Sequence, residues 1–338
     1  MRWWLTTALG TLSMAVMAAA AAAEPLSLRV LTSNIRYAAP GDAYEKPWSV
    51  RGPLLIERVA GLVSGNATAA TVIGMQEVLH EQLLDILAGL DASTSASSAS
   101  SASTSTSSSG SALSSGSISS SASGASWSYL GTGRDDGDQA GEYCPLFYQP
   151  ARTALLASTQ KWLSPTPDVP SFWPGAGSRR YVLAAVFQDI ASNTKFIAAN
   201  THLDNVSSAA RSEGVKIVLR VIRDMQAQWG MELPVVLSGD FNSEPGEDAY
   251  AAMVADGYLQ DAYVLAPEKG GRFGPYETYT GFVPDEIPDV SGRIDFLWLG
   301  PDAEDTWDVR RYEVVDNVVG GVFFSDHRPV FVDVTLRA

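Results

Sequence analysis

The sequence predicts an α/β or α+β sandwich, in which two β-sheets pack face to face and helices lie outside them. Candidate strands and helices alternate in the first part of the chain, whereas the later part is rich in strands. No internal repeat and no second domain boundary are visible. Once two stretches of biased composition are set aside, roughly 280 residues remain, which is enough for one large hydrophobic core.

The two biased stretches are residues 1–23 and residues 92–126. The first begins with Arg2 and continues through an apolar run into alanines, which is typical of a secretory signal cleaved after Ala23. The second is almost entirely Ser, Ala, Thr and Gly, so it cannot bury enough apolar surface to offset its ordering entropy. We therefore expect a secreted protein without a stable membrane anchor, interrupted by a disordered and O-glycosylated insertion.

The elements before the serine-rich stretch are assigned from the period of their apolar residues. Continuous or alternating apolar runs predict strands over residues 26–37 and 70–75. Apolar residues three and four positions apart predict helices over residues 50–63 and 81–90. The predicted order of elements in this part of the chain is therefore strand, helix, strand, helix.

The elements after it are mostly strands. Residues 181–190 and 195–200 predict an antiparallel pair joined by a short polar turn, and residues 206–229 predict the longest helix. The other expected strands are short apolar runs over residues 127–131, 146–148, 155–163, 233–237, 294–299, 312–315 and 329–336.

Charge and cysteine content narrow the function. The net charge of −15 disfavours binding to long nucleic acids, which usually requires a basic surface. Cys144 is the only cysteine, so no intramolecular disulfide is possible, and we expect a buried structural thiol. Asn66 and Asn205 each begin a sequon, which is a modest indication of N-glycosylation.

Polar residues of one chemical kind follow or begin the apolar strands. They are carboxylates, amides and imidazoles, namely Asn34, Glu77, His202, Asp204, Asp240, Asn242, Asp295, Asp326 and His327. Catalytic side chains are commonly presented at strand ends. Oxygen ligands with only three histidines in the chain favour Mg²⁺ or Mn²⁺ over zinc. Asp204 alone also reads as a turn residue before the long helix.

Six motifs carry a resemblance to a known family. They occupy residues 31–36, 76–77, 200–204, 239–242, 293–295 and 325–327. In this order they resemble the endonuclease/exonuclease/phosphatase family, over essentially the whole chain after residue 28. The resemblance implies a DNase I-like four-layer α/β sandwich with its site at one mouth between the sheets. It also implies a metal-dependent phosphoric ester hydrolase.

The resemblance assigns a role to each matching residue. Glu77 would hold the Mg²⁺ or Mn²⁺ ion, helped by Asn34 and Asp326, and Asp240 would orient and deprotonate the attacking water. Asn242 and His202 would donate to phosphate oxygens, while His327, oriented by Asp295, would contact the scissile phosphate. Donors aimed at the charge that develops in the transition state are physically reasonable, since losing one costs about 100–1000-fold in rate.

A second set of segments resembles a secreted and bacterial-type branch of that family, loosely akin to deadenylases of the carbon-catabolite-repressor and nocturnin type. Arg134, Glu142 and Arg180 are candidate substrate contacts by this resemblance. Arg36 stands where some nucleases of the family carry an acidic metal ligand. A cation there cannot bind metal, but it could bind a phosphate.

The leading hypothesis is a secreted, monomeric phosphodiesterase or phosphatase that acts on a small or short phosphorylated substrate. One alternative is a secreted nuclease or 3′–5′ exonuclease acting on RNA or DNA. An alternative of another class is a catalytically dead binding protein on the same fold. A serine-rich wall or adhesion protein would explain only residues 92–126.

Overall fold

The structure is a computed structural model that describes residues 24–39, 44–64, 69–99, 126–230, 232–283 and 291–337. The predicted signal of residues 1–23, the sequon at Asn66 and residues 100–125 of the serine-rich stretch lie outside these ranges. No helix within them has the length and apolar character needed to span a bilayer.

Two large mixed sheets form the centre of the described chain. The order of the first is β10 (Arg272–Phe273), β12 (Trp307–Val314), β15 (Val330–Leu336), β1 (Ser27–Asn34), β2 (Ala70–Gln76), β4 (Leu146–Tyr148) and β3 (Ser128–Leu130). The order of the second is β5 (Thr153–Trp162), β6 (Tyr181–Asp189), β7 (Lys195–His202), β8 (Val235–Asp240), β11 (Asp295–Gly300) and β9 (Gln260–Asp261). A separate hairpin pairs β13 (Val318–Val319) with β14 (Val322–Phe323).

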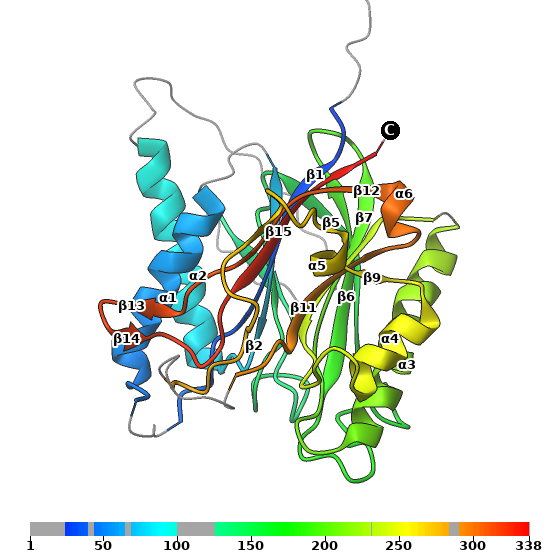
Figure 1. Ribbon diagram of the computed structural model, residues 1–338, viewed down its shortest axis with the longest axis horizontal. Helices are drawn as coiled ribbons and strands as arrows, with labels where there is room; N and C mark the ends of the chain where they lie inside the picture. The colour runs from blue at the N-terminus through cyan, green and yellow to red at the C-terminus, as the bar shows by residue number, and fades with distance from the viewer. Residues whose placement is uncertain are drawn as a thin grey trace, which may run out of the picture.

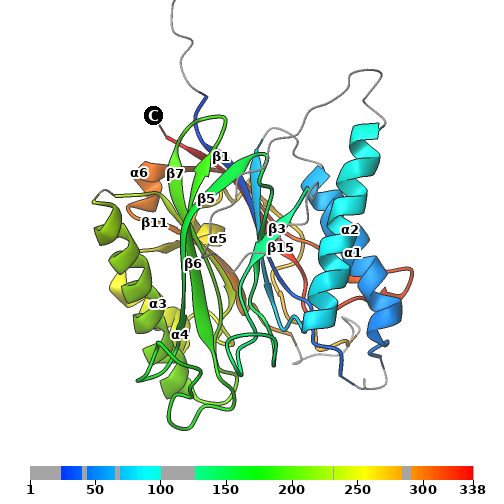
Figure 2. The same cartoon turned by 180° about the vertical axis from the view of Figure 1, so that it is seen from behind.

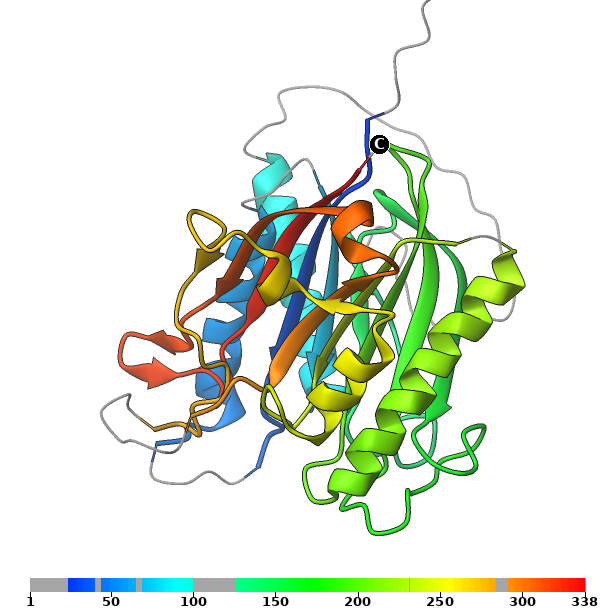
Figure 3. The same cartoon turned by 45° about the vertical axis from the view of Figure 1, so that its right-hand side comes forward.

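Helices cover both outer faces of the paired sheets. In Figure 1, α1 (Trp48–Ser64) and α2 (His80–Ala99) lie on one side, and α3 (Ser208–Trp229) and α4 (Asp248–Asp256) lie on the other. The reverse view in Figure 2 and the turned view in Figure 3 show the same arrangement of helix, sheet, sheet and helix. The short helices α5 (Ala262–Leu265) and α6 (Ala303–Thr306) pack near β11 and β12. The predicted four-layer sandwich is therefore confirmed.

Three apolar clusters fill the spaces between the layers. In β1, Leu28 and Val30 join the cluster between the sheets, whereas Leu31 joins the cluster beneath α1 and α2. This alternation follows from the two-residue period of a strand. A third cluster packs the second sheet against α3 and α4. Because both faces of the central strands are buried, their sequences read as continuous apolar runs.

Most long elements agree with the predicted ones to within a few residues, and β6 and β7 form the expected antiparallel pair. Strand β12 begins at Trp307, five residues before the run expected over 312–315, because charged residues alternate with its apolar ones there. Helix α2 differs, because it continues to Ala99 through residues expected to belong to the disordered insertion. Alanine favours helix, and the hydroxyls of Ser93, Thr94 and Ser95 donate back to carbonyls of the preceding turn. The short elements β9, β10, β13, β14, α4, α5 and α6 were not expected from the sequence.

Candidate active site

The predicted site residues meet because of how the strands pair. The parallel strands β7 and β8 place His202 opposite Asp240, and the antiparallel strand β11 places Asp295 opposite Asp240 on its other side. In the other sheet, the parallel strands β1 and β2 end together at Asn34 and Gln76, directly before Glu77. The antiparallel strand β15 begins beside the end of β1, just after His327. These residues therefore lie at one edge of the sandwich.

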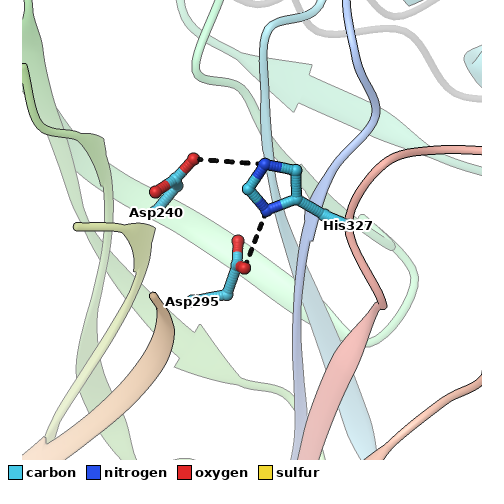
Figure 4. A group of neighbouring side chains, drawn as sticks. All are labelled: Asp240, Asp295 and His327. Atoms are coloured by element: carbon cyan, nitrogen blue, oxygen red, sulfur yellow. Dashed lines mark hydrogen bonds and ion pairs between the residues drawn. The ribbon is translucent and has the colours of Figure 1, made fainter. Parts of the chain in front are cut away.

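Asp240, Asp295 and His327 form the centre of this edge (Figure 4). Nδ1 of His327 lies 2.8 Å from Oδ2 of Asp295, and its Nε2 lies 3.8 Å from Oδ2 of Asp240. All three residues are buried. Burial alone would lower the pKa of His327, but the carboxylates of Asp295, Asp240 and Asp326 raise it to about 10. His327 is therefore an imidazolium at neutral pH.

The pKa of Asp240 is also raised, but here the rise disfavours the charged form. Burial, together with the neighbouring charge of Asp295, raises its pKa to about 7. Its Oδ1 accepts the backbone N–H of Asn242 at 2.9 Å, and its Oδ2 accepts the side-chain amide of Asn34 at 2.9 Å. A carboxylate that exchanges a proton near neutral pH has the pKa expected of a general base.

His202 and Asn242 contact one another beside Asp240. Nδ2 of Asn242 lies 3.0 Å from Nε2 of His202 and also donates to the carbonyl of Leu203 at 3.1 Å. Burial, with the positive charges of Arg180 and Arg134, holds the pKa of His202 well below its usual range. His202 is consequently neutral, unlike His327.

Asn34 connects the two sheets through its amide. Its Nδ2 donates to Oε1 of Glu77 at 3.0 Å as well as to Asp240 in the other sheet. Although burial would raise the pKa of Glu77, the bond from Asn34, the charge of His327 and the backbone N–H of Tyr37 lower it. Glu77 is thus ionised. Burial and the charge of Glu77 are among the causes that raise the pKa of Asp326.

The backbone at the site is strained. Arg36, Glu77 and Asn242 have φ angles of 58°, 60° and 46°. L-residues other than glycine, asparagine and aspartate rarely occupy this left-handed region, and such strain is concentrated at functional sites. Glu77 directly follows β2, and Arg36 and Asn242 each lie two residues after the ends of β1 and β8.

The residues present fit a divalent cation at Glu77, Asn34 and Asp326. Half-buried Glu77 and buried Asp326 supply two carboxylates whose mutual repulsion a cation would relieve. Their donors are oxygen atoms, which Mg²⁺ and Mn²⁺ prefer. Among the described residues, Asp240, Asp295 and His327 also bring ligand atoms within 4.8 Å of one another. Because His327 is protonated, that group forms an internal ion triad and fits a metal ion less well.

The candidate substrate contacts lie at two separate places in the structure. Arg134 donates to Glu142 at 2.7 Å, and Arg180 lies 4.0 Å from the same carboxylate, so these three residues form one cluster next to His202. Arg36 instead forms an ion pair with Glu45 at 3.4 Å, while its backbone N–H donates to Oδ1 of Asn34 at 2.9 Å. Its role as a phosphate contact remains a prediction.

Thr278 supports the site and was not found from the sequence. Its hydroxyl accepts the backbone N–H groups of both Ile294 and Asp295 at 3.0 Å, and its carbonyl accepts the N–H of Arg328 at 2.6 Å. Thr278 thereby joins the segment carrying Asp295 to the segment carrying His327. No motif marks a residue that acts through backbone contacts, and Thr278 lies 17 residues before Asp295, so the sequence offered no signal for it.

This fold and this site together define a metal-dependent phosphoric ester hydrolase. The family model of the endonuclease/exonuclease/phosphatase family matches residues 31–327, and the chain belongs to that family. A comparison with curated protein sequences finds no significant match.

Solved structures agree with this assignment. An endonuclease/exonuclease/phosphatase from Bacteroides vulgatus is 30% identical, covers 92% of this chain and 99% of its own, and has a TM-score of 0.70. A mannosyl-6-phosphatase from Bacteroides thetaiotaomicron is 27% identical, with 91% and 99% coverage and a TM-score of 0.71. The human nocturnin catalytic domain is 19% identical, with 93% and 94% coverage and a TM-score of 0.60, and it shares the fold.

Proposed function

We propose that the protein is a secreted hydrolase that cleaves small phosphorylated substrates by attack of water on phosphorus. One observation carries the proposal: Asp240 and His327 lie side by side, 3.8 Å apart, and lose their protons in different pH ranges. The pKa of Asp240 is about 7 and that of His327 about 10, so a proton acceptor and a proton donor coexist at neutral pH. A bound divalent ion would supply charge stabilisation for the phosphoryl oxygens.

The residues divide the work as follows. Asp240 takes a proton from the attacking water as the water oxygen bonds to phosphorus. The ester P–O bond breaks, and the departing oxygen takes up a proton from the solvent. The imidazolium of His327 donates a hydrogen bond to a phosphoryl oxygen, and Asp295 stabilises its positive charge. The amide of Asn242 turns from His202 to a second phosphoryl oxygen. Each donor acts where negative charge grows in the transition state.

The preference for a small substrate rests on two observations. The chain is strongly acidic, with a net charge of −15, whereas long nucleic acids are usually bound by basic surfaces. One of the similar solved structures is described as a mannosyl-6-phosphatase. We therefore propose a sugar phosphate or another small phosphate ester as the substrate class, and short nucleic acid as the alternative to be tested.

Hydrolysis of a substrate panel tests the proposal. Purified protein lacking residues 1–23 is assayed on p-nitrophenyl phosphate, bis-p-nitrophenyl phosphate, a hexose 6-phosphate and short RNA, with Mg²⁺, with Mn²⁺ and with EDTA. We expect metal-dependent turnover of a small ester that falls about 100–1000-fold in Asp240→Ala and His327→Ala. Asp224→Ala, an exposed position on α3, serves as the control. RNA as the best substrate by a wide margin would overturn the preference for small esters.

Secretion is a separate part of the proposal, because it rests on residues 1–23 alone. Expression of the full chain in a secreting host should place active protein in the medium, with a new N-terminus at Glu24. Recovery of the protein with Met1 intact in the membrane fraction would contradict it.

A further inference from the structure

A small cavity lies beside His202, on the side of Arg180. Arg134, Glu142, Arg180 and His202 line it, and its volume is about 10 Å³. This volume is about what a single water-sized group needs. Since His202 also lies 3.3 Å from Asp240 and contacts Asn242, the cavity adjoins the place where the phosphoryl group is attacked.

Arg180 is a buried cation with spare donors facing this cavity. Its side chain is 7% exposed, and its Nε and Nη1 have no hydrogen-bond partner among the described residues. Only Nη2 donates, to Oδ1 of Asn205 at 3.2 Å. Buried guanidinium donors are rarely left without partners, so an absent acceptor is indicated.

The carboxylates near Arg180 are already engaged. Glu142 accepts a hydrogen bond from Arg134 at 2.7 Å and reaches Arg180 only at 4.0 Å. Asp204 lies 4.0 Å from Nε of Arg180, but its two oxygens accept four backbone N–H groups. The positive charge of Arg180 also lowers the pKa of both Glu77 and His202, which places it close to both halves of the site.

We infer that Arg180, supported by Arg134, selects phosphate monoesters over diesters by binding a bare phosphoryl oxygen in this cavity. The inference rests on the proposed function, since it concerns the substrate of the same site. A monoester carries three non-bridging oxygens and a second negative charge near neutral pH, because its second pKa is about 6. His327 and Asn242 contact two of those oxygens, and Arg180 binds the third. In a diester one of the three carries a carbon group, so only two bare oxygens remain for the three contacts.

Binding to the unaltered protein gives the first test. Titration calorimetry at neutral pH with Mg²⁺ compares methyl phosphate with dimethyl phosphate. We expect methyl phosphate to bind at least about ten times more tightly, equivalent to about 1.4 kcal/mol. Equal binding, or tighter binding of dimethyl phosphate, would overturn the inference. This outcome is independent of turnover, so failure of the proposed hydrolysis is recognised separately in the substrate panel.

Variants of Arg180 give the second test. Arg180→Met should lower kcat/KM for p-nitrophenyl phosphate about 100-fold or more, the loss expected for a key donor, while bis-p-nitrophenyl phosphate changes several-fold at most. Arg180→Lys keeps the positive charge but lacks the forked guanidinium group. Its kcat/KM for p-nitrophenyl phosphate should therefore lie between those of the unaltered protein and Arg180→Met. Arg223→Met, on α3 and paired with Asp256, is the control. Equal losses for both esters would mean that Arg180 does not discriminate. If Arg180→Met does not fold, the Arg180→Lys variant and the calorimetry still test the inference.

Discussion

Asp204 illustrates how one carboxylate can organise the rim of the site. Oδ2 accepts the backbone N–H groups of Gly177 and Ser178 at 2.9 and 3.1 Å. Oδ1 accepts those of Val206 and Ser207 at 3.1 and 2.8 Å, at the start of α3. Asp204 is therefore more than a local turn residue. It joins the segment before β6 to the segment after β7, on either side of Arg180.

This arrangement predicts a pH-dependent contribution to stability. Burial would raise the pKa of Asp204, but the four backbone N–H groups lower it below its ordinary value. A lowered folded-state pKa means that the stabilisation is present at neutral pH and is lost as pH falls through that lowered value. Asp204→Asn replaces one acceptor oxygen by a donor and should reduce the free energy of unfolding at pH 7 by about 1–3 kcal/mol.

Urea unfolding at pH 7 and at successively lower pH measures this difference. The difference in the free energy of unfolding between the unaltered protein and Asp204→Asn should become smaller as the pH falls. Asp224→Asn, at an exposed position, should show no comparable difference at any pH. A gap that stays constant over the whole range would contradict the charge argument.

At the scale of secondary-structure elements, Thr278 holds the start of β11 next to the segment before β15 through hydrogen bonds to the backbone of both. Thr278→Val keeps the shape but removes the acceptor of two buried N–H groups, so Asp295 should lose its fixed position against His327. We expect kcat to fall about tenfold to 100-fold, because small misplacements of catalytic groups have effects of this size. Thr278→Ser keeps the hydroxyl and should retain most of the activity. Equal activity of the two variants would refute this role.

Helix α2 gives a second prediction at this scale. The carboxylate of Asp91 accepts the N–H groups of Ser126 and Trp127 at 2.8 Å, and Oγ1 of Thr94 accepts Nε1 of Trp127 at 3.1 Å. The second half of α2 is therefore tied to the segment that enters β3, through Thr94 and Ser126 of the predicted insertion and through Asp91 and Trp127 beside it. Replacing residues 100–125 by a short Gly/Ser linker should leave activity and melting temperature nearly unchanged. Deleting residues 92–126 should lower the melting temperature by several degrees, and differential scanning fluorimetry separates the two outcomes.

The sequence predicts the long elements well because each carries a clear apolar period, as in β1 and α3. It does not predict α4, α5 or β9, since α5 and β9 have only four and two residues and α4 completes fewer than three helical turns. The predicted catalytic and metal-binding residues converge because they stand at or next to strand ends. The role of Thr278 and the unpartnered donors of Arg180 could not be predicted from the sequence. They depend on backbone positions and on the shape of a cavity, which only the packed structure defines.

For the whole molecule, the site exists only where the two sheets meet. Asn34 and Glu77 belong to one sheet, and His202 and Asp240 belong to the other. The hydrogen bond from Asn34 to Asp240 crosses between them, as does the bond from Nε2 of Gln76 to Oδ1 of Asn200 at 2.7 Å. These polar contacts in an otherwise apolar interface fix how the sheets are aligned, so the metal-ligand side and the general-base side face each other.

The pairing of β1 with β15 also has a consequence for folding. The ladder joins Ser27 to Thr335 and continues to Thr32 opposite Val330, so two strands from distant parts of the sequence must meet before the first sheet is complete. His327 lies three residues before β15, and the docking of β15 beside β1 brings it to the site. Strand pairs this far apart in sequence form slowly, because the loop between them must close first. Hydrolytic activity should therefore appear together with this ladder during refolding, and not with the helices.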